Sequence, residues 1–159
     1  MAYALGKEGR KVLLLERDLS EPVRIVGELL QPGGYLKLKQ LGLEWCVDGI
    51  DAQKVYGYAM YKDDGEALVG YPLEGRGEDV AGRSFHNGRF VMRLREAAMS
   101  VATNDVRQAT VKKLLAEDGS EWKEGNTVGG VMAMIDEKEH KFMAPLTVVC
   151  DGYFSAFRK

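Results

Sequence analysis

The sequence predicts an α/β fold with an open sheet, and three observations support this prediction. The runs at residues 12–16 and 146–150 are almost continuously apolar and finish at a carboxylate, Glu16 or Asp151, as buried parallel strands beside a ligand site do. Between them, residues 89–102 repeat apolar side chains at helical spacing. Short alternating segments separated by turn residues follow that stretch, and this pattern is typical of an antiparallel meander.

Each predicted element follows from its local pattern. Gly9 ends the first helix, Pro22 prevents continuation of the first strand, and Asp63-Asp64-Gly65 is a hairpin turn. In order, we expect the end of a helix (1–8), a strand (11–16), a Pro-Gly-Gly turn (32–34) with a short helix that ends at Gly42, a strand pair (51–61 and 66–73), a polar loop (74–84), the long helix (89–102), a meander (109–119, 127–136 and 140–144) and a final strand (146–150).

Composition excludes several classes of protein. The net charge is −2, so no basic face for nucleic acid is expected. The two cysteines lie among apolar residues and predict reduced core thiols, and two histidines are too few for a histidine-based metal cluster. No apolar run approaches the roughly 18 residues of a membrane span. We therefore expect a globular domain with no metal site.

Glu16 is the first candidate ligand, because an acid at the end of an apolar strand can accept hydrogen bonds from a ribose. Acids also end many strands that bind nothing, so the pattern leaves both readings open. In a dinucleotide fold a glycine-rich loop lies about 20 residues before such an acid, which places the loop just before Met1. We expect the chain to lack that loop and both flanking parts of a longer protein.

Three longer stretches resemble the FAD-dependent monooxygenases, and more narrowly the squalene monooxygenases (squalene epoxidases). They are "ERDLSEPVRIVGELLQPGGY" (16–35), "GRSFHNGRF" (82–90) and "PLTVVCDGYFSAFRK" (145–159). The resemblance implies a partial FAD-binding, Rossmann-like fold of the hydroxylase type, with an inserted antiparallel substrate-domain sheet and a β-meander. It assigns residues 1–50 and 82–159 to an incomplete FAD-binding domain and residues 51–81 to the start of the substrate-binding sheet.

The resemblance also implies the roles of individual residues. Tyr58 would lie between flavin and substrate as the catalytic residue, although Tyr56 shares its face and periodicity does not separate them. His86 is expected to be a turn residue rather than an acid or base. Cofactor-binding roles fall on seven residues: Glu16 and Arg17 at the ribose, Arg24 and Arg95 at the flavin cofactor, Val111 at the adenine end, and the Asp-Gly fingerprint of Asp151 and Gly152, whose glycine lets the backbone approach the pyrophosphate. From local pattern alone, these could equally be solvated charges and strand or turn residues.

The function that the resemblance implies is epoxidation of squalene to 2,3-oxidosqualene, with FAD as cofactor and NADPH supplying electrons through a separate NADPH–cytochrome reductase. The enzyme would act at the cytoplasmic face of the endoplasmic reticulum membrane, held there by segments outside this chain. We expect the 159 residues alone neither to hold FAD tightly nor to turn over squalene. The alternatives are another flavin-dependent monooxygenase or reductase of the same fold, and a non-catalytic, truncated remnant.

Overall fold

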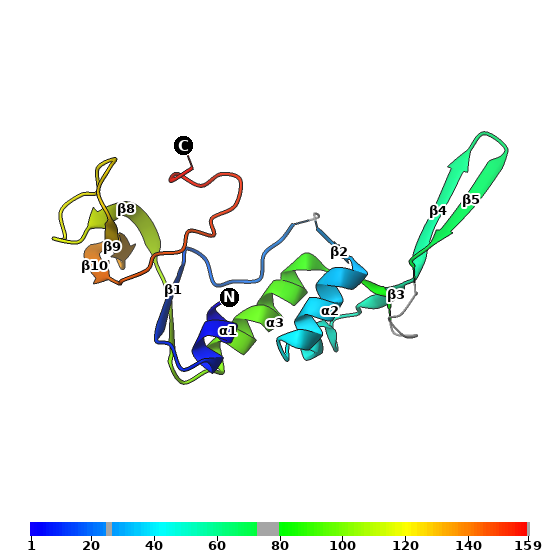
Figure 1. Cartoon of the computed structure of the whole chain (residues 1–159), viewed down its shortest axis with the longest axis horizontal. Coiled ribbons are helices and arrows are strands. Elements are labelled where there is room, and N and C mark those ends of the chain that lie inside the picture. Colours follow the sequence, from blue (N-terminus) through cyan, green and yellow to red (C-terminus); the bar gives the residue numbers. More distant parts are fainter. Residues whose placement is uncertain (25–26, 73–79, 159) are drawn as a thin grey trace. The chain divides into compact units, whose positions relative to one another are not determined.

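The computed structural model describes residues 1–24, 27–72 and 80–158 (Figure 1). These residues form two compact units. Unit 1 comprises residues 1–13 and 20–105, and unit 2 comprises residues 14–19 and 106–159. The predicted division into residues 1–50, 51–81 and 82–159 concerns domains of a longer protein, and it stays a prediction.

Unit 1 is built around three helices and a 3-10 turn, whose apolar sides pack into two clusters. Cys46, Leu43 and Ala97 are buried in the first, and in the second Phe85 stacks on Phe90 with ring centroids 4.5 Å apart. Ala97 leaves room for the 3-10 turn to approach the long helix. The helical elements are α1 (Ala2–Lys7), α2 (Pro32–Gln40), η1 (Glu44–Val47) and α3 (Asn87–Met99), of which α1 and α3 lie side by side in Figure 1.

The remaining strands of unit 1 form two small antiparallel sheets. In the first, β6 (Gly82–Ser84) lies between β2 (Leu29–Leu30) and β3 (Gln53–Val55). The second is a hairpin of β4 (Gly57–Lys62) and β5 (Gly65–Gly70), with the predicted turn at its tip, where Asp63 has a φ of 51°. The predicted antiparallel sheet in this part of the chain is therefore confirmed.

Strands β1 (Val12–Glu16) and β7 (Asn104–Gln108) form a two-stranded parallel ladder. The Val12 amide donates to the Thr103 carbonyl over 3.2 Å, and the Ala109 amide donates to the Glu16 carbonyl over 2.8 Å. From the first hydrogen bond to the second, the residue numbers increase along both strands, so the two strands run parallel. The strand predicted at residues 11–16 is confirmed, although its side chains are only partly buried.

Unit 2 contains the predicted meander. Its strands are β8 (Thr110–Ala116), β9 (Val128–Ile135) and β10 (Lys138–Met143), and β9 lies between the other two. The β9–β10 turn has positive φ at Asp136 and Glu137, 47° and 63°, as a tight hairpin turn requires. Ala133 and Leu115 are buried between the strands. Local turn chemistry therefore predicted this sheet correctly.

One predicted strand is wrong. Residues 146–150 were expected to form a buried strand, but they form no regular strand, and Leu146, Val148 and Val149 are 74%, 49% and 45% exposed. A strand needs a neighbour to receive its backbone hydrogen bonds. No strand among the described residues pairs with this run, so it remains extended and open to solvent.

Three other predictions need correction in detail. The segment 51–61 is broken at Tyr56 into two strands that belong to different sheets. The Pro-Gly-Gly sequence is the first turn of α2 rather than a turn before it, because Pro32 occupies the first helical position, where no amide donor is needed. Part of the expected polar loop at 74–84 is strand β6, while residues 73–79 lie outside the described residues. No helix in the described ranges is long and apolar enough to cross a membrane.

Candidate functional site

The predicted pyrophosphate residues lie beside an open cavity of about 580 Å³ in unit 2. Residues between Val149 and Arg158 line it, and Asp151 and Gly152 are among them. The Ser155 hydroxyl donates to the Asp151 carboxylate over 3.2 Å and fixes its orientation. Gly152 has a φ of 75° and no atom within 4 Å of where a Cβ would stand. Backbone here is therefore open to close approach by a ligand.

Glu16 and Val111 occupy ordered strands of the same unit. Glu16 is the last residue of β1, and its carboxylate accepts a hydrogen bond of 3.1 Å from the Asp18 amide. Val111 lies on β8 opposite Ala133, and Arg17 follows Glu16 with an exposed side chain. None of these three residues lines the cavity beside Asp151. The structure thus fixes each of them locally without bringing Glu16 and Asp151 to one cavity.

In unit 1, the segment after β1 runs along α3. The Arg95 guanidinium donates to the Ser20 carbonyl over 2.7 Å, and two helical turns earlier Gly88 faces the Pro22 carbonyl. A Cβ on Gly88 would stand 2.2 Å from that oxygen, so only glycine allows this approach. Arg95 and Gly88 therefore hold residues 20–22 against the helix. The exposed Arg24 follows this segment two residues later, so its position along the helix is restricted.

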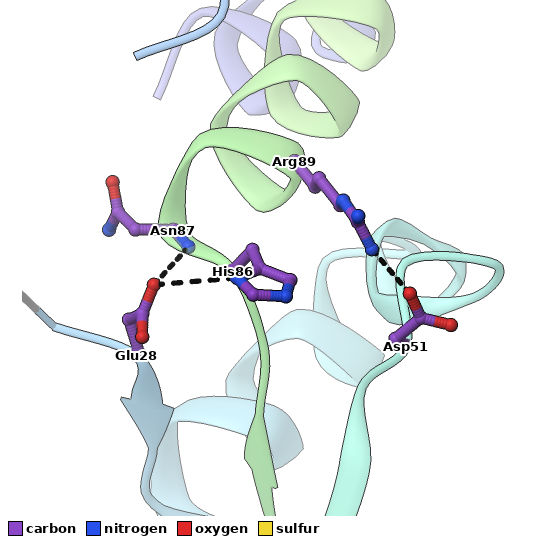
Figure 2. Close-up of polar contacts among 5 residues, drawn as sticks. All are labelled: Glu28, Asp51, His86, Asn87 and Arg89. Carbon is purple, nitrogen blue, oxygen red and sulfur yellow. Dashed lines mark hydrogen bonds and ion pairs between the residues drawn. The ribbon is translucent and has the colours of Figure 1, made fainter. Parts of the chain in front are cut away.

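The N-terminus of α3 is capped by a carboxylate from 59 residues away. Glu28 accepts a hydrogen bond of 3.3 Å from the Asn87 amide, and the same oxygen lies 3.9 Å from Nδ1 of His86 (Figure 2). A negative charge at this position interacts favourably with the helix dipole. His86 was expected to be a turn residue, but it is the extended residue that precedes the first helical turn, and its side chain is 65% exposed.

A second ion pair fixes the other side of this turn. The Arg89 guanidinium reaches the carboxylate of Asp51, a residue with a φ of 57° (Figure 2). Asp51 precedes β3, so the pair joins the start of α3 to the entry of the strand that leads toward Tyr58. Both side chains are well exposed, so the pair contributes little to stability and mainly orients the loop.

Tyr58 lies on β4, is 45% exposed as a residue, and accepts a hydrogen bond at its hydroxyl. The amide Nε2 of Gln31 donates to this hydroxyl, and Gln31 is the residue that precedes α2. The pKa of Tyr58 is lowered, first by the hydroxyl of Tyr71 and then by Gln31. Tyr56, which was expected to share its face, is 60% exposed and lies between β3 and β4. The hydroxyl contacts distinguish Tyr58 from Tyr56, which periodicity did not.

Sequence reasoning missed several residues that organise these contacts. Glu28, Gln31 and Gly88 lie inside the stretches that carry the family resemblance, but nothing in their spacing shows that Glu28 meets Asn87 or that Gly88 meets Pro22. Within the described ranges no group of three or more His, Cys, Asp or Glu side chains could hold a metal ion. Cys46 is a buried core thiol, as predicted, whereas Cys150 is exposed.

Curated relatives match the chain from end to end. Squalene epoxidase 3 of Arabidopsis thaliana and a squalene monooxygenase of Panax ginseng are each 54% identical to it over 160 residues, and squalene epoxidase erg1 of Schizosaccharomyces pombe is 48% identical over 161 residues. Each match covers 100% of this chain. The chain spans only 28% to 34% of the length of these relatives. No family model matches it.

Solved structures share the fold at low identity. A myxobacterial FAD-dependent halogenase for chondrochloren superposes with a TM-score of 0.68 over 90% of this chain and 32% of its own, at 24% identity. A probable FAD-dependent monooxygenase from Pseudomonas aeruginosa gives 0.61 over 87% of this chain and 35% of its own, at 19% identity. The α/β prediction of an FAD-monooxygenase fold is thus confirmed. Along its whole length, the chain is therefore similar to a segment of the squalene epoxidases.

Proposed function

We propose that this chain is the part of an FAD-dependent squalene epoxidase that contains the second strand of the nucleotide-binding sheet and the first strands of the substrate sheet. The proposed reaction adds one oxygen atom of O₂ to squalene and gives 2,3-oxidosqualene. The observation that carries the proposal is the end-to-end match to squalene epoxidases, which includes all three motif stretches.

The residues present fit an FAD molecule by their chemistry. Gly152 leaves its backbone uncovered, and the neighbouring Asp151 carboxylate is held in place by Ser155. Glu16 ends a strand with one carboxylate oxygen already oriented by a backbone amide. An exposed backbone suits a pyrophosphate, and a fixed carboxylate suits a ribose hydroxyl. In this proposal Glu16 and Arg17 hold the ribose, the backbone at Gly152 meets the pyrophosphate beside the cofactor-binding Asp151, and Val111 meets the adenine end.

The chain's own groups bind and orient in this reaction. Arg95 stiffens the segment that carries Arg24, whose guanidinium would meet polar atoms of the cofactor. Tyr58 presents an aromatic wall and one hydroxyl toward the substrate side. A bound reduced flavin supplies the activation of O₂ and the transfer of oxygen to an alkene, while the protein supplies orientation and the exclusion of water.

Electron supply and location belong to the same proposal. NADPH is the proposed source of electrons, through a separate NADPH–cytochrome reductase. Because squalene is a hydrocarbon that does not dissolve in water, the enzyme would take it from a membrane, for which we propose the cytoplasmic face of the endoplasmic reticulum. Segments outside these 159 residues would provide the membrane contact.

The test is a segment exchange. The 160 aligned residues of Arabidopsis squalene epoxidase 3 are replaced by this chain, and the purified protein is supplied with FAD, NADPH, a reductase and squalene. We expect 2,3-oxidosqualene by mass spectrometry, with one oxygen from ¹⁸O₂. Geranylgeranyl and phenolic compounds are assayed in parallel.

Two outcomes would contradict the proposal. A folded, flavin-loaded exchange protein that oxidises the other compounds but not squalene indicates a different flavin-dependent monooxygenase. A folded exchange protein that binds no flavin indicates a non-catalytic remnant. The unmodified Arabidopsis enzyme is the positive control for reductase and substrate delivery.

A further inference from the structure

A buried hydroxyl next to Tyr58 has been described so far only by its effect on the pKa of Tyr58. It belongs to Tyr71, which directly follows β5 and is joined to the start of β4 by its amide, a donor to the Tyr56 carbonyl over 2.9 Å. The ring of Tyr71 meets the ring of Tyr58 edge-on, with centroids 5.6 Å apart and planes at 78°. The hairpin backbone therefore fixes Tyr71 against Tyr58.

The Tyr71 hydroxyl is enclosed rather than solvated. Its oxygen is buried and makes no hydrogen bond of regular geometry in the described part of the chain. It lies over Gly82 of β6, where a Cβ would stand 3.5 Å from it. A buried hydroxyl without a full hydrogen bond is costly, so the nearby Tyr58 hydroxyl is its natural partner.

The direction of this contact follows from the acid–base behaviour of the two phenols. The Tyr71 hydroxyl lowers the pKa of Tyr58, and Gln31 lowers it further. Contact with Tyr58 raises the pKa of Tyr71, and desolvation adds to the increase. Donors to a phenol oxygen stabilise its ionised form, and giving a proton to a neighbour stabilises the protonated donor. The direction expected for this contact is therefore donation from Tyr71 to Tyr58.

We propose that Tyr71 is a positioning residue for Tyr58. With Gln31 and Tyr71 both donating to the Tyr58 oxygen, the proton of Tyr58 is the only part of that hydroxyl left for another partner. That proton is directed to the open side of the ring, where it serves a hydrogen-bond acceptor on the bound cofactor or on the oxygenated product. The role in catalysis rests on the proposed function, whereas the contact itself does not.

The contact is tested in the 159-residue chain with tyrosine labelled by ¹³C at Cζ. Seven tyrosines give seven signals, and Tyr58→Phe and Tyr71→Phe assign the two that matter. We expect Tyr58 to titrate at higher pH in Tyr71→Phe than in the unmodified chain, and Tyr71 to titrate at lower pH in Tyr58→Phe. Tyr61→Phe removes an exposed hydroxyl of the same hairpin and should leave both titrations unchanged.

The two single variants make the result decisive even if one of them fails to fold. If Tyr71→Phe keeps the amide spectrum of the chain but Tyr58 titrates as before, the contact does not exist. An unchanged titration of Tyr71 in folded Tyr58→Phe has the same meaning. Movement of both titrations in the expected directions supports the contact.

Catalysis is tested separately in the exchange protein. Tyr71→Phe should lower kcat about tenfold, as expected for one hydrogen bond used in the transition state, with KM for squalene unchanged because squalene has no acceptor. The double variant with Tyr58→Phe should lose no more than Tyr58→Phe alone. Additive losses would overturn the positioning role. An inactive parent exchange protein would refute the proposed function and leave the titration result standing.

Discussion

The two cysteines differ in environment, and this gives the first prediction at the scale of single residues. Cys46 has no exposed surface, and burial raises its pKa from 9.0 to about 11, while Cys150 is exposed. A thiol reacts as its thiolate, so at pH 8 we expect an alkylating reagent to modify only Cys150 in the folded chain and both cysteines in urea. Cys150→Ser should abolish labelling of the folded chain. Equal labelling rates for the two thiols would contradict the buried core.

The same thiol makes stability depend on pH. Because the pKa of Cys46 is higher in the folded state, the unfolded chain loses this proton first, and stability falls as pH rises from about 9 toward about 11. The stabilising effect is fully present below pH 9. Urea unfolding of the chain and of Cys46→Ala across this range should show a steeper decline for the chain. Parallel declines would show that Cys46 ionises as readily when folded.

Gly88 gives the second prediction at this scale. A methyl group there would collide with the Pro22 carbonyl, so Gly88→Ala should lower the free energy of unfolding by about 1–3 kcal/mol. Gly33 is the matched control, because it also lies in the first turn of a helix and has no atom within 4 Å of its missing Cβ. Gly33→Ala should be neutral or stabilise by about 0.5 kcal/mol. Similar effects at both positions would argue against a close contact at Gly88.

At the scale of elements, the start of α3 depends on a cap from Glu28, a residue that precedes β2 and is distant in sequence. Removal of the Glu28 carboxylate leaves the Asn87 amide without its acceptor, so Glu28→Ala should lower the free energy of unfolding by about 1 kcal/mol. Glu28→Gln keeps an acceptor but loses the charge at the helix terminus, and an intermediate loss is expected. Urea unfolding measures both. No loss in either variant would mean that Glu28 does not cap α3.

The elements also show how far sequence alone predicts this fold. The meander β8–β10 was predicted because its turns are local: Asp118-Gly119 and residues 136–138 specify reversal by themselves. Helix α3 was predicted from its spacing, within a few residues of its ends. These elements need no information from the rest of the chain.

The errors arise where an element depends on a distant partner. The run at 146–150 has the pattern of a buried strand, but burial requires a neighbour that the described residues do not provide. Strand β6 was taken for loop because Gly82, Arg83 and Ser84 have no strand pattern, although β2 and β3 pair with it on both sides. The contact of Glu28 with α3 spans 59 residues and leaves no local trace.

The candidate site divides in the same way. The motif residues from Glu16 to Gly152 could be named from their resemblance to a family. The groups that fix them, such as Ser155 on Asp151 and the Ser20 carbonyl on Arg95, required coordinates. Tyr58 was chosen over Tyr56 from the resemblance, and the contact with Gln31 that sets Tyr58 apart also required coordinates.

At the scale of the whole molecule, much apolar surface is exposed. Leu68 on β5 and Leu146 are each 74% exposed, and Tyr61 is 72% exposed. Large exposed apolar areas mark surfaces that bind another molecule or associate with a second copy of the protein. We expect the purified chain to bind a fluorescent hydrophobic dye. In size-exclusion chromatography, we expect its apparent mass to increase with protein concentration. Leu68→Lys with Leu146→Lys should reduce both effects, and a chain that neither binds dye nor associates would contradict this description.

The most direct test of the account is the flavin content of the segment-exchange protein, because the central claim is that Glu16 and Asp151 both hold FAD. We predict about one FAD per protein after dialysis, a marked loss in Glu16→Ala and in Asp151→Ala, and no loss in the exposed hairpin control Glu66→Ala. A folded exchange protein that keeps its full flavin content without both carboxylates would contradict the claim.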